Sequence, residues 1–214
     1  SPEAFEQLAK SEEALILDVR TQQDFIKNHI PGAIFIGLNG GFAPWVGALI
    51  SDINQPILLV VPEGMSEEAV TRLARVGYDN TLGYLEGGMD AWTASGKTTD
   101  QIRSISADAF SEKSNDNQLH VLDVRKETEY AAEHVDEAYN KPLDCINSWF
   151  MEMDDSKPFY LHCAGGYRSM IAASILKSRG VHNFKEVDGG FAAIAKTQLP
   201  KTDFMCQSKL QKLS

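Results

Sequence analysis

The sequence predicts an α/β protein with two similar domains, each built on a mainly parallel sheet with helices on both faces. Two observations predict this fold class. Short segments of the first half of the 214-residue chain recur in the second half at a nearly constant offset. Within each half, short apolar segments alternate with segments of helical period, which is typical of parallel sheets joined by crossover helices.

The internal repeat defines the domain organisation. Leu-Asp-Val-Arg occupies positions 17–20 and recurs at positions 122–125. The other matched segments are 1–5 with 106–110, 29–30 with 134–135, and 86–88 with 188–190. Two copies of one domain of about 100 residues explain this spacing. We therefore expect domains over residues 1–98 and 104–214, joined by a short polar linker.

Each copy is expected to contain strands followed by helices. The predicted strands are short apolar runs at 14–17, 56–61, 119–122 and 158–162. Those at 56–61 and 158–162 are nearly continuous, which is typical of strands covered on both faces. Helical spacing of apolar residues follows each of these two strands, over residues 66–76 and 169–179, and each helix is expected to end at the next glycine, Gly77 or Gly180.

Composition limits the classes of partner. The chain carries 30 acidic and 20 basic residues, a net charge of -10, which argues against nucleic acid or an anionic membrane as a partner of the whole surface. No apolar run approaches the roughly 20 residues that a membrane span needs. No signal peptide is visible at the N-terminus, and the sparse cysteine usage described next leads us to expect a cytoplasmic protein.

The cysteines do not form a recognisable framework. There are three, Cys145, Cys163 and Cys206, and this odd, sparse set predicts neither disulfides nor a metal site. A reducing cytoplasm suits such usage, and we expect no metal and no cofactor. We expect Cys145 to pack on a helix, while Cys206 lies in a polar tail, and neither is assigned a chemical role.

The segment with the clearest chemistry follows the strand predicted at 158–162 and reads Cys163, Ala164, Gly165, Gly166, Tyr167, Arg168, Ser169. The cysteine stands at the carboxyl end of a buried strand, where open α/β sheets bind ligands. Backbone N–H groups of the glycine-rich loop and of the helix N-terminus can form a cup for an anion. Arg168 adds a positive charge, and Ser169 is expected to cap the helix. Such a cup favours a thiolate, so Cys163 is the candidate nucleophile.

With these motifs, and with His-Ile-Pro-Gly-Ala at 29–33, the chain resembles tandem rhodanese-homology proteins over nearly all of its length. The resemblance implies a sulfurtransferase of two rhodanese-like domains, in which Cys163 carries sulfane sulfur as a persulfide held by the N–H groups of residues 164–169. It implies thiosulfate or a persulfide as the donor, and a thiol or cyanide as the acceptor. It also implies that Asp123 and Arg125 are structural and tie the first strand to the loop.

The first copy departs from this pattern in its loop. Alignment of the helices places Val60 or Val61 where the second copy has its cysteine, and the loop reads Pro-Glu-Gly-Met-Ser at 62–66. This loop has no nucleophile and no arginine, and Glu63 adds a negative charge that repels anions. We therefore expect the first copy to be an inactive domain.

A cysteine phosphatase is one alternative function. The signature of those enzymes, His-Cys-x5-Arg, resembles the present loop, but only four residues separate Cys163 from Arg168. A tighter cup suits a single sulfur atom better than a phosphate group. His162 precedes the nucleophile, but alternation along a strand points its side chain the other way, so we interpret it as a packed strand residue.

A non-catalytic sulfur-binding or regulatory module of a larger enzyme is the other alternative. The loop resembles those of rhodanese domains fused to metallo-β-lactamase-fold persulfide dioxygenases. The chain contains no His-x-His-x-Asp-His metal motif. Any fused domain of that kind would therefore lie outside this chain.

Overall fold

The computed structural model describes residues 1–115, 120–154 and 156–205. The chain divides into two compact units, Ser1–Ile102 with Lys177–Arg179, and Arg103–Leu176 with Gly180–Ser214. Two residues discussed above, Leu119 of a predicted strand and Cys206 of the polar tail, lie outside the described residues.

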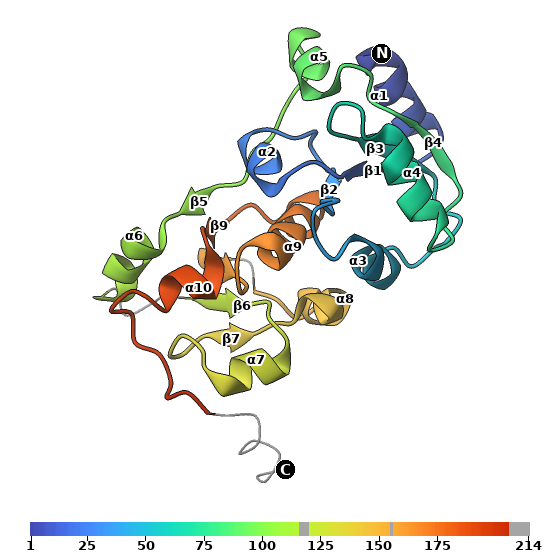
Figure 1. The fold of residues 1–214 in the computed structure, drawn as a ribbon. Helices are drawn as coiled ribbons and strands as arrows, with labels where there is room; N and C mark the ends of the chain where they lie inside the picture. The colour runs from blue at the N-terminus through green and yellow to red at the C-terminus, as the bar shows by residue number, and fades with distance from the viewer. Residues whose placement is uncertain (116–119, 155, 206–214) are drawn as a thin grey trace. The chain divides into compact units, whose positions relative to one another are not determined.

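The first unit is a four-stranded sheet in the order β2-β1-β3-β4, and all neighbouring strands are parallel (Figure 1). From β1 the chain moves in one direction to β2 and then in the other to β3 and β4, so right-handed crossovers place helices on both faces. The elements are α1 (Pro2–Ser11), β1 (Leu15–Asp18), α2 (Gln22–Lys27), β2 (Ile34–Phe35), α3 (Phe42–Leu49), β3 (Ile57–Val60), α4 (Ser66–Ala74), β4 (Thr81–Tyr84) and α5 (Gly88–Ala94).

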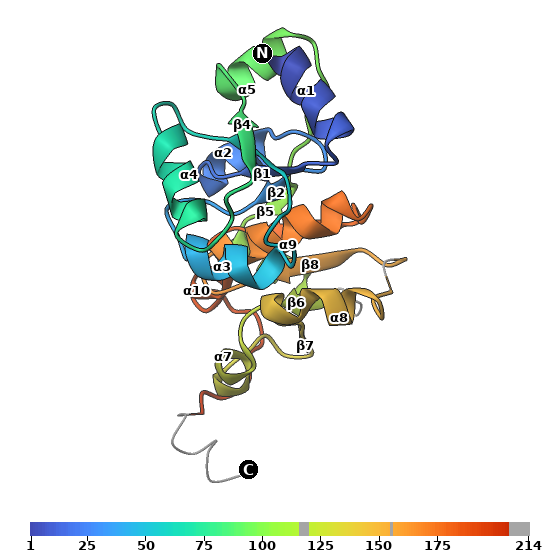
Figure 2. The ribbon, with the colours of Figure 1, turned by 90° about the vertical axis from the view of Figure 1, so that its right-hand side faces the viewer.

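The second unit is a five-stranded parallel sheet in the order β5-β9-β8-β6-β7. Strand β8 lies between β6 and β9, and Figure 2 shows α9 along one face of this sheet. The elements are β5 (Ser104–Ile105), α6 (Ala107–Ser111), the 3-10 helix η1 (Glu112–Asn115), β6 (Val121–Asp123), α7 (Glu127–Ala132), β7 (Tyr139–Asn140), the 3-10 helix η2 (Leu143–Cys145), α8 (Ile146–Phe150), β8 (Phe159–His162), α9 (Tyr167–Ser178), β9 (Phe184–Val187) and α10 (Gly190–Ile194).

The central strands β3 and β8 are apolar because both of their faces are covered. All residues of β3 are buried, and only one residue of β8 is not. Leu59 and Leu161 are fully buried and lie opposite leucines of β1 and β6 at matching register. The expected α/β fold with parallel sheets in both copies is confirmed.

The helix after β8 begins earlier than the sequence predicted. We expected Ser169 to cap it, but α9 begins at Tyr167, and the Ser169 hydroxyl donates to the Gly166 carbonyl at 3.0 Å from inside the first turn. The expectation that Ser169 is a cap is therefore wrong. Gly166 has a φ of 102°, which glycine adopts without a Cβ clash, and this tight turn lets the helix start directly after it.

The described part of the chain has neither a membrane-spanning helix nor a cluster of metal ligands. None of its helices is long and apolar enough to cross a bilayer. Within the same residues, no group of three His, Cys, Asp or Glu side chains is arranged to hold a metal ion.

Candidate active site

A buried ion pair at the carboxyl end of β6 holds the backbone beside the cysteine loop. Arg125 donates through Nε and Nη2 to the carboxylate of Asp123 over 2.6 to 3.0 Å, and both side chains are buried. Arg125 also donates to the Glu133 carbonyl at 2.8 Å, and its guanidinium lies 4.0 Å from the centre of the Phe191 ring. The pair thus connects β6 to the end of α7 and to α10, and it is not a surface ion pair.

Cys163 follows β8 directly, and its side chain is only 1% exposed. The Gly166 N–H donates to Sγ at 3.1 Å. The Ser169 Oγ lies 3.5 Å from the same sulfur. The Gly166 N–H stabilises negative charge on the sulfur, and the Ser169 hydroxyl lies near enough to add a second hydrogen bond, so this arrangement suits a thiolate or a persulfide anion.

The Gly-Gly pair at the start of α10, Gly189 and Gly190, allows this helix to approach the loop closely. Gly190 has a φ of 55°, and a Cβ there would lie 2.5 Å from the Cys163 carbonyl oxygen. The Phe191 N–H donates to that same carbonyl at 2.7 Å. The Ala192 N–H donates to the Ala164 carbonyl at 2.9 Å. The start of α10 therefore binds the backbone of the cysteine loop, and only glycine fits at position 190.

Arg168, in the first turn of α9, is paired with an acid. Its Nη1 and Nη2 donate to the two carboxylate oxygens of Glu129 at 2.6 and 2.8 Å. This bidentate contact holds the pKa of Glu129 below its ordinary value and raises that of Arg168. The positive charge that the sequence predicted is present, but a partner on α7 balances much of it.

A second acid, Glu186 of β9, is completely buried behind the loop. Its Oε1 lies 2.7 Å from the Ser169 Oγ, and its Oε2 has no hydrogen-bond partner among the described residues. Burial raises the pKa of Glu186 to about 8; the Ser169 hydrogen bond opposes this shift and the charge of Asp188 adds to it. The carboxyl is therefore mainly neutral at neutral pH.

The other predicted loop residues surround this centre. Ala164 and Tyr167 are half-buried, and Gly165 is exposed. Burial raises the pKa of Tyr167, which keeps its phenol neutral. The structure therefore brings Gly166 and Ser169 to the sulfur and turns Gly165 toward solvent.

His162 and Cys145 stand outside the reacting centre. His162 is buried, its Nδ1 lies 3.2 Å from the Cys163 carbonyl oxygen, and desolvation lowers its pKa, so the imidazole is neutral. It packs within the sheet, as strand alternation predicted. Cys145 is the last residue of η2, directly before α8, and it is exposed, so the expectation that its side chain packs on a helix is wrong.

The family of the chain follows from two matches. A model of the rhodanese-like domain matches residues 1–95 and again residues 106–197. The chain belongs to the rhodanese-like family. The putative sulfur carrier protein YrkF of Bacillus subtilis is 33% identical over 94 residues, which are 44% of this chain and 49% of that protein. A tRNA uridine(34) hydroxylase of Chlamydia trachomatis is 30% identical over 104 residues, 45% of this chain and 32% of that protein. The aligned part thus spans half or less of these curated relatives.

Solved rhodanese-like structures resemble parts of the chain. A rhodanese-related protein from Thermoplasma volcanium is 27% identical, with a TM-score of 0.43, over 47% of this chain and 97% of that one. A thiosulfate sulfurtransferase from Pseudomonas aeruginosa is 18% identical, with a TM-score of 0.42, over 94% of this chain and 43% of that one.

The register of the first rhodanese-like copy identifies which valine replaces the cysteine. Val60 lies opposite Asp18 across the parallel pair. In the second copy, His162 lies opposite Asp123 in the same way. The next residue, Val61, therefore takes the position of the cysteine.

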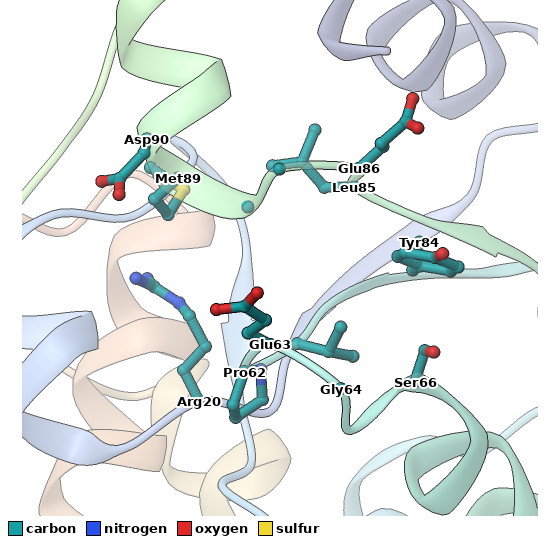
Figure 3. Close-up of a pocket in the computed structure, with 13 residues that line it drawn as sticks. Arg20, Pro62, Glu63, Gly64, Ser66, Tyr84, Leu85, Glu86, Met89 and Asp90 are labelled. Atoms are coloured by element: carbon teal, nitrogen blue, oxygen red, sulfur yellow. The ribbon is translucent and has the colours of Figure 1, made fainter.

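A pocket of about 580 Å³ opens at this position in the first copy. Figure 3 shows Glu63 of the loop and Arg20, which follows β1, reaching into it, with Asp90 of α5 at its edge. Glu86 and Ser66 also line this pocket. None of the residues that line this pocket is a cysteine, so the first copy has no sulfur carrier at this place.

Sequence reasoning missed Glu129 and Glu186. A weak signal was available for Glu186, because it shares an inward position with apolar residues in the strand Phe184–Val187. Glu129 gave no signal beyond its place in the first turn of α7, where acidic residues are common. The partner of Glu129 is Arg168 and that of Glu186 is Ser169, and both partners lie far away in the sequence.

Proposed function

We propose that the second rhodanese-like copy is a sulfurtransferase in which Cys163 carries sulfane sulfur as a persulfide. The observation that carries this proposal is the contact of the Cys163 sulfur with the Gly166 N–H, 3.1 Å away, in a loop at the carboxyl end of a central parallel strand. The rhodanese-like family match and a relative named as a putative sulfur carrier protein support sulfur transfer in general.

The chemistry has two half-reactions. The Cys163 thiolate attacks the outer sulfur of a donor such as thiosulfate, an S–S bond forms on the protein, and the donor S–S bond breaks so that sulfite leaves with the electron pair. An acceptor thiolate or cyanide then attacks the terminal sulfur and releases the Cys163 thiolate. The donors that contact the sulfur, the Gly166 N–H and the Ser169 hydroxyl, stabilise the anionic sulfur in both steps.

Intact-mass spectrometry of the full chain tests this proposal. The chain is incubated separately with thiosulfate and with glutathione persulfide, and the expected result is the gain of one sulfur atom, which cyanide then removes. A chain that gains no sulfur from either donor contradicts the proposal.

Matched variants assign the carrier. Cys163→Ser is expected to abolish the mass gain, whereas Cys145→Ser, which removes an exposed thiol, is expected to leave it unchanged. A mass gain that persists in Cys163→Ser means that another residue carries the sulfur. Turnover of p-nitrophenyl phosphate that is lost in Cys163→Ser would favour a phosphatase instead.

A further inference from the structure

The hydroxyl of Ser169 has one hydrogen and three acceptors within reach. The Glu186 Oε1 is 2.7 Å from its Oγ, the Gly166 carbonyl oxygen is 3.0 Å away, and the Cys163 Sγ is 3.5 Å away. A hydroxyl donates only one hydrogen bond at a time, although its oxygen can accept two. Whether the sulfur receives this hydrogen therefore depends on what Glu186 does.

The protonation state of Glu186 decides which of Glu186 and Ser169 donates the hydrogen bond between them. An ionised carboxylate only accepts, so it takes the Ser169 hydrogen. A neutral carboxyl donates to the Ser169 Oγ, and the serine hydrogen is then available to the sulfur, which as an anion is the stronger remaining acceptor. A buried carboxylic acid kept neutral can thus serve as a hydrogen-bond donor.

We propose that Glu186, as a neutral acid, is a positioning residue that donates to Ser169 and so directs the Ser169 hydroxyl to the sulfur of Cys163. The inference rests on the proposed role of Cys163 as the sulfur carrier. No proton leaves the Glu186–Ser169 pair in this role; the acid only sets the direction of the hydrogen bond.

The surroundings of Glu186 favour the neutral form. Its register partners on the two neighbouring strands, Leu161 of β8 and Ser104 of β5, carry no charge. From α9 it meets the Ser169 hydroxyl, and the charge that acts on it is that of Asp188, just beyond β9. Burial and this like charge together raise the pKa of Glu186 to about 8.

The hydrogen bond from Ser169 to the Cys163 sulfur is expected to weaken as the pH rises. Below about pH 8 Glu186 is neutral, and the Ser169 hydrogen supports the anionic sulfur. As the pH rises through this value, Glu186 ionises, withdraws the serine hydrogen and places a second negative charge near the sulfur. The sulfur then loses this hydrogen bond and faces a second negative charge, so its anionic form is stabilised less above about pH 8 than below it.

The test is the ultraviolet absorbance of the Cys163 thiolate in the full chain across pH. The matching Cys163→Ser chain is subtracted in every background, which cancels the other two cysteines and the tyrosines. In Glu186→Gln the amide N–H still donates to Ser169 but cannot ionise, so below about pH 8 the two chains are expected to show the same thiolate absorbance. Just above this pH the native chain is expected to show less thiolate absorbance than Glu186→Gln. Equal absorbance of the two chains at every pH overturns the proposal.

Ser169→Ala tests the bridge itself. Loss of a hydrogen bond to a charged sulfur is expected to reduce the thiolate-to-thiol ratio of Cys163 about tenfold at a pH below 8. Ser174→Ala is the matched control, because Ser174 lies on the same helix, is also buried, and its hydroxyl also donates to a carbonyl three residues back. If both variants give the native curve, the proposal is wrong.

Asp188→Asn is a second variant that tests the proposal even if Glu186→Gln does not fold. Because Asp188 is exposed, its substitution is expected to leave the fold intact. Removal of this negative charge lowers the pKa of Glu186, so just below pH 8 Asp188→Asn is expected to show less thiolate absorbance than the native chain. Equal absorbance of these two chains contradicts the proposal. These titrations need no sulfur donor, so they can succeed or fail independently of the mass-spectrometric test of sulfur transfer.

Discussion

The two rhodanese-like copies share a buried ion pair in nearly identical geometry. In the first copy, Arg20 Nη2 donates to Asp18 Oδ2 at 2.7 Å and to a carbonyl at the end of the next helix at 2.7 Å. In the second copy, Arg125 makes the same two contacts with Asp123 and with the corresponding carbonyl, at 2.6 and 2.8 Å. The first copy keeps this ion pair although its loop has no cysteine. We therefore infer that the pair stabilises the fold.

The copies differ in the loop after the central strand. Gly64 and Gly166 both have positive φ values, 74° and 102°, so the turn itself is similar. In the first copy, however, Val61 replaces the cysteine, Pro62 has no N–H to donate, and Glu63 carries a negative charge. The loop of the first copy therefore lacks the cysteine and one backbone N–H, and it carries a negative charge.

The second difference lies behind the loop. Tyr84 and Glu186 each stand two residues before the acidic residue that precedes a Gly-Gly pair. Tyr84 is 53% exposed, whereas Glu186 is completely buried against Ser169. The two copies therefore share a backbone and a buried ion pair, and a few side chains on and behind one loop distinguish them.

The shared ion pair offers the largest expected effect. Arg20→Ala and Arg125→Ala each leave a fully buried aspartate without its partner, which costs about 3–5 kcal/mol of stability in the unit that carries the change. Hydrogen-exchange mass spectrometry of the full chain can measure the loss for β1 and β6 separately. Lys10→Ala, which removes the partner of an exposed pair, is the control and is expected to have little effect. Very different losses in the two units would show that the pair does not serve both copies equally.

Restoring a thiol to the first copy tests whether the nucleophile alone distinguishes the loops. In a Cys163→Ser background, Val61→Cys is expected to load sulfur at least about a hundredfold more slowly than the native chain, because Pro62 cannot donate an N–H and Glu63 repels the donor. The measurement is the rate of mass gain from thiosulfate. Adding Pro62→Ala and Glu63→Gly is expected to recover part of the rate. Near-native loading by Val61→Cys alone would contradict the importance of the loop.

The Gly-Gly pairs provide a matched comparison of close approach. Gly190→Ala places a methyl group against the backbone of the cysteine loop, whereas nothing lies within 4 Å of the corresponding Cβ at Gly88. Both positions have positive φ, so each alanine costs about 1 kcal/mol, and Gly190→Ala is expected to cost about 1–3 kcal/mol more. Urea unfolding and sulfur loading measure the two effects. Equal losses in the two variants would mean that α10 does not press on the loop.

The Glu129–Arg168 pair gives the smallest expected effect. Glu129→Gln frees the Arg168 charge while keeping an oxygen for the Lys126 N–H, so the KM for thiosulfate is expected to fall about threefold, as suits a partly exposed ion pair. Glu127→Gln, on the exposed face of the same helix, is the control. The KM for an uncharged sulfur donor is expected to change little. An unchanged KM for thiosulfate would show that Glu129 does not restrain Arg168.

The sequence by itself determined the repeat, the parallel α/β fold and the place of Cys163. These features depend on local patterns, because apolar runs, helical spacing and glycines act through the nearest neighbours in the chain. The same patterns could not tell whether Val60 or Val61 corresponds to Cys163. They also predicted that α9 begins at Ser169, two residues later than it does. Strand register and the backbone at Gly166 decided these points, and neither can be read from periodicity.

Only the tertiary structure decided the electrostatics of the site. Arg168 meets Glu129, 39 positions away, and Ser169 meets Glu186, 17 positions away. Such contacts arise when separate strands and helices pack side by side, and burial then sets which groups carry charge. A sequence pattern can place a nucleophile at the end of a strand, but the partners that tune it come from other elements, and packing alone determines which of these reach it.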